Sequence, residues 1–201
     1  MSGPLRVFLA GEGRSELGSR AGHPAYQSGA QPGVIEILLR RVQAVGWEVC
    51  GAREWKSVRN LQVGIGANDT KRVLALALDA IEADCGVLAF TRDRDNDHER
   101  PAAVQLGVER ARAAHQVDII GEVAVPVLEG WALAMRGMRD TEELSPGGAK
   151  TKLSDIGLRG ASALADAARE ADLDSLPDDA CSLRKWLSLG RAVLSDAVAS
   201  R

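Results

Sequence analysis

Apolar residues follow two spacings along the chain, one typical of strands and one typical of helices. Short apolar runs, which indicate buried strands, occupy residues 5–10, 47–52, 86–90 and 119–125. Between and after these runs, apolar positions three or four residues apart predict helices. The expected helices span residues 34–45, 68–83, 101–115, 127–138, 161–171 and 182–199.

Strands that alternate with helices predict a parallel sheet covered on both faces. We therefore expect a doubly wound, Rossmann-like α/β domain of about four strands over residues 1–139. Residues 140–201 are expected to be a helical segment packed on that domain, with SPGGAK, residues 145–150, as a loop. Ligands of such sheets bind beyond the carboxyl ends of the strands, so the residues that follow each strand are candidates for a site.

Composition narrows the class of protein. The 201 residues are 45% apolar, which is enough for one domain with a sizeable core, and the four tryptophans are expected to be core or interface residues. The net charge of −3 argues against binding nucleic acid by bulk positive charge, although 25 Lys and Arg leave room for a local basic groove.

Cysteines and hydropathy indicate a cytoplasmic protein. Cys50 and Cys85 lie beside apolar runs, no CxxC spacing is present, and we expect buried thiols, which suit a reducing compartment. No stretch approaches the roughly 18 apolar residues of a membrane span, so no membrane association is expected.

A glycine-rich loop follows the first expected strand. GEGRSE, residues 11–16, has the first two glycines of a dinucleotide-binding GxGxxG loop but carries Glu16 in the third position. Glu12 would repel a pyrophosphate, and the terminal GK[ST] of a P-loop is absent. The loop therefore offers two carboxylates rather than a phosphate cradle, unless both are simply solvated acids.

A second acidic cluster, TRDRDNDH, follows the third expected strand at residues 91–98. If the strand continues, Asp93 and Asp95 project to the same side, and two such carboxylates repel each other unless a hard cation such as Mg²⁺ lies between them. An EF-hand is rejected because His98 replaces the required glycine. A haloacid-dehalogenase motif is disfavoured because Asp97 stands where Thr or Val belongs. The alternative is an acidic turn that leads into the next helix.

A third acid, Glu129, follows the fourth expected strand within the apolar segment PVLEGWAL. An acid in apolar surroundings needs a partner or a metal ion. The alternative is a favourable interaction with the N-terminus of the helix in which it lies. We expect Glu12, Asp93 and Asp95 to converge within about 8 Å of one point, the span that two bridging cations could serve, and Glu129 to approach them more loosely.

These motifs together resemble the Toprim (topoisomerase–primase) superfamily, and most nearly its overcoming-lysogenization-defect nucleases. The likeness covers residues 5–152. The Pro…Glu-x-Trp-x-Leu segment around Glu129 and the Pro-x-x-x-Lys of residues 146–150 further resemble a small bacterial Toprim-like family, often encoded beside phage-defence or ATPase genes.

The resemblance implies Mg²⁺- or Mn²⁺-dependent phosphodiester hydrolysis of DNA or RNA, with a role in phage defence. Lys150, ahead of Lys152, is a separate candidate for contacting a phosphate during catalysis. The resemblance implies that Glu12 is a metal ligand or general acid–base group. It implies further metal ligands at Glu16, Asp93, Asp95 and Glu129. His23 and Tyr26, in the long first loop, are additional residues that could reach the site.

Two departures from the small family leave alternatives open. Val127 and Met135 stand where that family usually carries acids. A non-catalytic subunit that binds an ATPase or a toxin-like partner is therefore the main alternative, and a metal-dependent phosphatase acting on a small molecule is a third.

Overall fold

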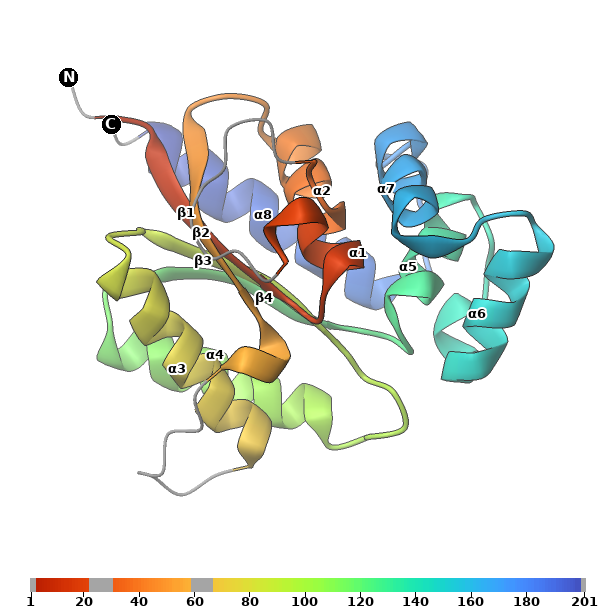
Figure 1. Cartoon of the computed structure of the whole chain (residues 1–201), viewed down its shortest axis with the longest axis horizontal. Coiled ribbons are helices and arrows are strands. Elements are labelled where there is room, and N and C mark those ends of the chain that lie inside the picture. Colours follow the sequence, from red (N-terminus) through yellow and green to blue (C-terminus); the bar gives the residue numbers. More distant parts are fainter. Residues whose placement is uncertain (1–2, 22–30, 59–66, 200–201) are drawn as a thin grey trace.

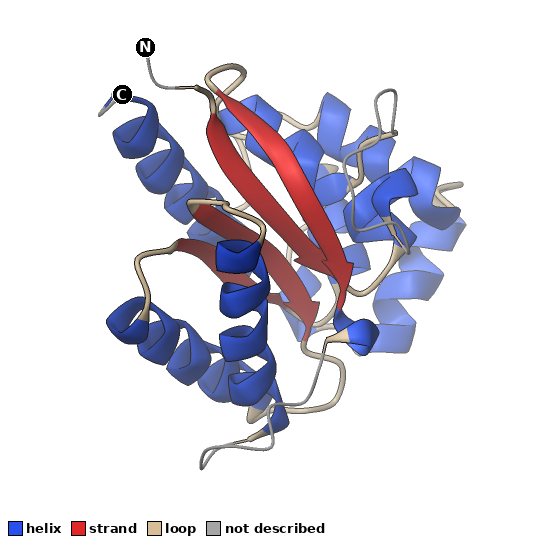
Figure 2. Cartoon of the chain, turned by 60° about the vertical axis from the view of Figure 1, so that its left-hand side comes forward, coloured by secondary structure: helices blue, strands red, loops and turns tan. Residues whose placement is uncertain are grey.

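The fold is an α/β sandwich built on one parallel sheet. A computed structural model describes residues 3–21, 31–58 and 67–199, with side chains up to residue 195. Its four strands are β1 (Leu5–Gly11), β2 (Trp47–Glu54), β3 (Val87–Asp93) and β4 (Asp118–Ala124). All neighbouring strands are parallel and the order is β2-β1-β3-β4 (Figure 2). The expected fold class is thus confirmed.

Helices cover both faces of this sheet (Figure 1). They are α1 (Arg14–Leu17), α2 (Val34–Val42), α3 (Asn68–Glu82), α4 (Arg100–Ala114), α5 (Leu128–Met135), α6 (Pro146–Asp155), α7 (Gly160–Glu170) and α8 (Cys181–Ala199). Short 3₁₀ turns lie at Gly18–Arg20, Trp55–Ser57 and Thr141–Glu143. Within the described ranges, no helix combines the length and apolar character needed to cross a bilayer.

The alternation of side chains along the strands separates two cores. Phe8 and Leu88 pack with α3 and α4 on one face, whereas Val7 and Ala89 pack with α2 and α8 on the other. All four tryptophans are buried, as expected, and the Trp186 Nε1 donates a hydrogen bond to the Phe90 carbonyl oxygen at 2.8 Å. Helix α8 therefore forms part of the layer that covers the sheet.

The expected end of α2 at residue 45 and the expected loop at residues 145–150 are wrong, and α5 ends at Met135 rather than at residue 138. Helix α2 ends at Val42 rather than at residue 45, because Gln43 adopts extended backbone and Val45 is 71% exposed, so nothing buries a further turn. SPGGAK is not a loop but begins α6. The Ser145 Oγ accepts a hydrogen bond from the Gly148 N–H at 3.0 Å and Pro146 occupies the first turn, which is a favourable helix start.

The expected pair of buried thiols is also wrong. Cys50 of β2 and Cys85, just before β3, form a disulfide with a Cα–Cα distance of 6.5 Å and a sequence separation of 35. The sheet and the end of α3 bring these residues together, which their spacing in the sequence does not reveal. The cysteines therefore give no support for a reducing compartment, and Cys181 is an exposed free thiol.

Candidate functional site

Four carboxylates line one pocket at the carboxyl edge of the sheet. The pocket has a volume of about 240 Å³, and its acidic residues are Glu12, Glu16, Asp93 and Glu129. Glu12 directly follows β1, Asp93 is the last residue of β3, Glu129 lies in the first turn of α5 after β4, and Glu16 belongs to α1. The carboxyl ends of parallel strands share one edge, which explains why these acids meet.

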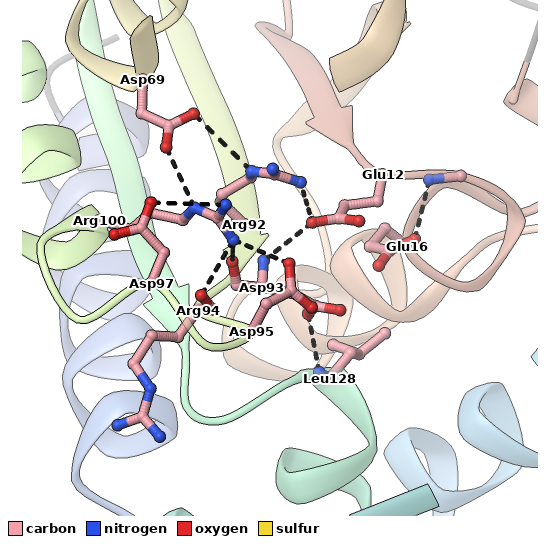
Figure 3. A network of polar contacts seen from close by, with 11 residues as sticks. Glu12, Glu16, Asp69, Arg92, Asp93, Arg94, Asp95, Asp97, Arg100 and Leu128 are labelled. Atoms are coloured by element: carbon pink, nitrogen blue, oxygen red, sulfur yellow. Dashed lines mark hydrogen bonds and ion pairs between the residues drawn. The ribbon is translucent and has the colours of Figure 1, made fainter. Parts of the chain in front are cut away.

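Glu12 and Asp93 lie side by side at this edge, as the sequence predicted. The Glu12 Oε1 accepts a hydrogen bond from the Asp93 backbone N–H at 3.2 Å (Figure 3). The expectation would have failed had the two residues occupied opposite ends of the sheet. Both acids instead border the same pocket, together with Glu16 and Glu129.

The glycines of the first loop allow close backbone packing. A Cβ on Gly11 would lie 2.4 Å from the Glu16 Cβ, and a Cβ on Gly18 would lie 2.0 Å from the Gln31 carbonyl oxygen. The Gly13 N–H donates to the Glu16 Oε2 at 3.0 Å, so it serves the helix start. This arrangement agrees with the interpretation of the loop as a support for carboxylates rather than a phosphate cradle.

Burial raises the pKa of the Glu16 and Asp93 carboxyls. Glu16 is only 5% exposed, and burial, with the nearby Glu12 charge, raises its pKa to about 7. Burial, together with the charges of Glu12 and Glu16, raises the pKa of Asp93 to about 8. The Leu128 N–H donates to the Asp93 Oδ1 at 2.8 Å and opposes this shift. A cation in the pocket would relieve the same repulsion.

Asp95 does not line the pocket with Asp93, and the extended backbone that would align the two side chains is absent. Strand β3 ends at Asp93, and Asp95 adopts a left-handed backbone with φ of 52°. Side chains alternate only while the backbone is extended, and the turn sends the Asp95 carboxylate to Arg100, whose Nη1 lies 2.8 Å away. Asp97 also pairs with Arg100, at 3.6 Å.

An arginine network behind the pocket was missed by the sequence interpretation. Arg92 forms an ion pair with Glu12, and its Nε lies 3.9 Å from Asp69 in the first turn of α3. Arg100 in turn binds Asp69 at 3.1 Å (Figure 3). The only indication of this network in the sequence was the alternation of Arg and Asp in TRDRD. Such a run of charges does not show which ion pairs form with residues on other elements.

Other candidate residues fall at different distances from the pocket. Lys150 is exposed on α6 and does not line the pocket, so its phosphate contact stays a prediction. Arg14 does line it, and within the described residues its guanidinium has no hydrogen-bond or ion-pair partner. His98 is exposed on the turn before α4. His23 and Tyr26 lie outside the described residues.

The donor set suits a hard divalent cation in its chemistry, because all four acids offer oxygen ligands. Among the residues that the structure describes, however, no three Asp, Glu, His or Cys side chains are close enough as they stand to hold one ion. Glu12 is also held by Arg92. Binding of Mg²⁺ or Mn²⁺ therefore requires these carboxylates to draw together.

Comparisons with known proteins give no functional assignment for this chain. No protein-family model, no curated protein and no solved structure matches the chain. The Toprim resemblance thus rests on the motif residues quoted above. Of the five acids that it implicates, four line one pocket, whereas Asp95 pairs with Arg100.

Proposed function

We propose that the chain is a metal-dependent phosphodiesterase of the Toprim type that acts on nucleic acid. The observation that carries this proposal is the pocket at the carboxyl edge of the sheet, where Glu12, Glu16, Asp93 and Glu129 meet. The pKa values of Asp93 and Glu16, about 8 and about 7, are raised first by burial and then by neighbouring carboxylates, and a divalent cation would stabilise the charged forms of both groups.

The four acids divide into two roles in this proposal. Asp93, Glu16 and Glu129 would hold Mg²⁺ or Mn²⁺, which when bound neutralises phosphate charge and activates water. Asp93 is oriented by the Leu128 N–H. Glu12, whose side chain is 31% exposed, borders the pocket and can share the ion or accept the proton of the attacking water.

The first test is metal binding and cleavage by the wild-type chain. Mn²⁺ is titrated calorimetrically, and labelled single- and double-stranded DNA and RNA are incubated with Mg²⁺, Mn²⁺ or EDTA. We expect Mn²⁺ binding and polymer cleavage that EDTA abolishes. Activity confined to free nucleotides or small phosphate monoesters would favour the small-molecule phosphatase. Absence of both binding and cleavage would reject the proposed enzyme.

Arg14 is expected to contact a phosphate of the substrate. It is exposed at the pocket and has no charged partner within the described residues, whereas Arg92 is already paired with Glu12. Arg14→Gln should weaken oligonucleotide binding in Ca²⁺ and lower the slope of log affinity against log salt by about 1, because one phosphate contact is lost.

Fluorescence anisotropy of a labelled oligonucleotide over a salt series measures this effect. Arg110→Gln, an exposed arginine on α4, is the matched control and should leave the slope unchanged. Identical salt slopes for the two variants would show that Arg14 does not contact a phosphate of the substrate.

The second candidate function is a non-catalytic subunit that binds an ATPase or a toxin-like partner. Val127 and Met135 are buried where the small family usually carries acids, and Arg92 already neutralises Glu12. A chain that binds no Mn²⁺, cleaves no polymer and co-purifies with an ATPase encoded beside it would support this function.

A further inference from the structure

We propose that Arg92 is an internal counter-ion that positions Glu12 and competes with the metal ion for it, an inference that rests on the proposed function. The Glu12 Oε1 receives two donors, the Arg92 guanidinium and the Asp93 N–H. Its Oε2 has no hydrogen-bond partner within the described residues. Glu12 is therefore fixed through one oxygen and keeps the other for the pocket that it lines (Figure 3).

Arg92 is itself held in place from the side away from Glu12. Its side chain is 14% exposed, its Nε lies 3.9 Å from an Asp69 carboxylate oxygen, and its guanidinium carbon lies 5.5 Å from the Trp55 ring centroid. Asp69 is fixed in turn by Arg100 at 3.1 Å. Because these charges alternate in sign, the position of Arg92 is set by residues that do not line the pocket.

Two effects of Arg92 on the pocket have opposite signs. A divalent cation bound by the carboxylates would lie near the Arg92 charge and would share Glu12 with it, so Arg92 weakens metal binding. Arg92 also fixes the orientation of Glu12, on which the proposed proton transfer depends. A residue with a merely structural role would not separate these two effects, because its loss would weaken metal binding and activity together.

The test compares Mn²⁺ affinity and steady-state cleavage in wild type and Arg92→Gln. We expect Arg92→Gln to bind Mn²⁺ about threefold tighter or better, because a neighbouring positive charge is removed. We expect its kcat to fall about tenfold or more, with KM little changed, because Glu12 loses its orientation. Arg92→Lys keeps the charge, so it should bind Mn²⁺ like wild type and recover part of kcat.

Two further variants keep the outcome decisive. Arg94→Gln is the matched control, since Arg94 is two residues away and Figure 3 shows its guanidinium directed away from Glu12; its Mn²⁺ affinity should equal that of wild type. Asp69→Asn removes the charge behind Arg92 and should weaken Mn²⁺ binding about threefold, the opposite direction from Arg92→Gln. Asp69→Asn decides the question if thermal melting shows that Arg92→Gln does not fold.

Failure of this inference differs from failure of the proposed function. A wild-type chain that binds no Mn²⁺ overturns both. Wild-type binding and cleavage, combined with Mn²⁺ affinities in folded Arg92→Gln and Asp69→Asn that equal the wild-type value, overturn the role of Arg92 alone. Weaker Mn²⁺ binding by folded Arg92→Gln likewise overturns it and makes Arg92 a structural residue.

Discussion

Asp93→Asn is expected to lower metal-dependent cleavage by about 100-fold or more, because the substitution removes a ligand charge from the centre of the carboxylate pocket. The fold should persist, since an asparagine Oδ1 can still accept the Leu128 N–H that lies 2.8 Å from the Asp93 Oδ1. Calorimetry should show a parallel loss of Mn²⁺ affinity.

Asp118→Asn is the matched control for this loss. Asp118 is exposed at the first residue of β4, at the opposite end of the sheet from the carboxylate pocket. Its substitution should leave both cleavage and Mn²⁺ binding at wild-type levels. Cleavage by Asp93→Asn within twofold of the Asp118→Asn rate would exclude Asp93 from the site.

Asp93→Asn should also stabilise the metal-free protein at high pH. The pKa of Asp93 is raised from 3.8 to about 8, so the folded state binds more protons than the unfolded state between these values, and stability falls as pH rises through this window. At about pH 3, below the unfolded pKa of 3.8, the carboxyl is mostly neutral in both the folded and the unfolded state, so the two proteins should be equally stable. Near pH 9 we expect Asp93→Asn to be more stable by about 2 kcal/mol, a figure that allows for partial exposure of the group.

Urea unfolding in EDTA at the two pH values measures this difference, and saturating Mn²⁺ should reverse the order because the ion stabilises the wild-type site. A wild-type chain that is the more stable of the two at high pH without metal would contradict the raised pKa of Asp93.

Gly18→Ala is expected to lower the free energy of unfolding by about 3 kcal/mol, because it combines backbone strain with a steric overlap. Gly18 has φ of 63°, and an added Cβ would lie 2.0 Å from the Gln31 carbonyl oxygen and 2.6 Å from the Gly33 nitrogen. Both contacts are with backbone, which cannot move aside cheaply.

Gly13→Ala provides the matched control from the same loop. Gly13 has an extended φ of 178°, and no atom lies within 4 Å of an added Cβ. Its unfolding free energy, measured in urea, should stay near the wild-type value. Because Gly13 is also the second glycine of the GxGxxG-like stretch, loss of ligand binding in Gly13→Ala would revive the phosphate-cradle interpretation that the structure disfavours.

The arrangement of the sheet was predictable from the sequence because the burial of each strand and helix determines where its apolar residues occur. Strands β1 and β3 are covered on both faces, so their sequences are largely apolar. The helices have apolar residues along the one face that packs on the sheet. Parallel strands place their carboxyl ends at one edge, so the sequence alone predicts that Glu12 and Asp93 lie close together.

The remaining features depend on contacts that no local pattern encodes. The Cys50–Cys85 disulfide joins residues 35 positions apart, and the Arg92–Asp69 contact joins β3 to α3. Ala67 is the N-cap of α3, and the Asp69 carboxylate in the first turn binds Arg100 instead of capping the helix. Which opposite charges pair is decided by how the α3–α4 layer packs on the sheet.

The turn at Asp95 has a consequence for how relatives of this chain would diverge. Left-handed backbone is tolerated best by Gly, Asn and Asp, so inherited variation at position 95 should be confined mainly to these three residues. Position 93, by contrast, is constrained by charge within the pocket. The two aspartates of D-x-D are therefore under unrelated selection. A distant descendant that reads D-x-G or D-x-N would keep both the turn and the pocket acid while escaping any search that demands the intact motif.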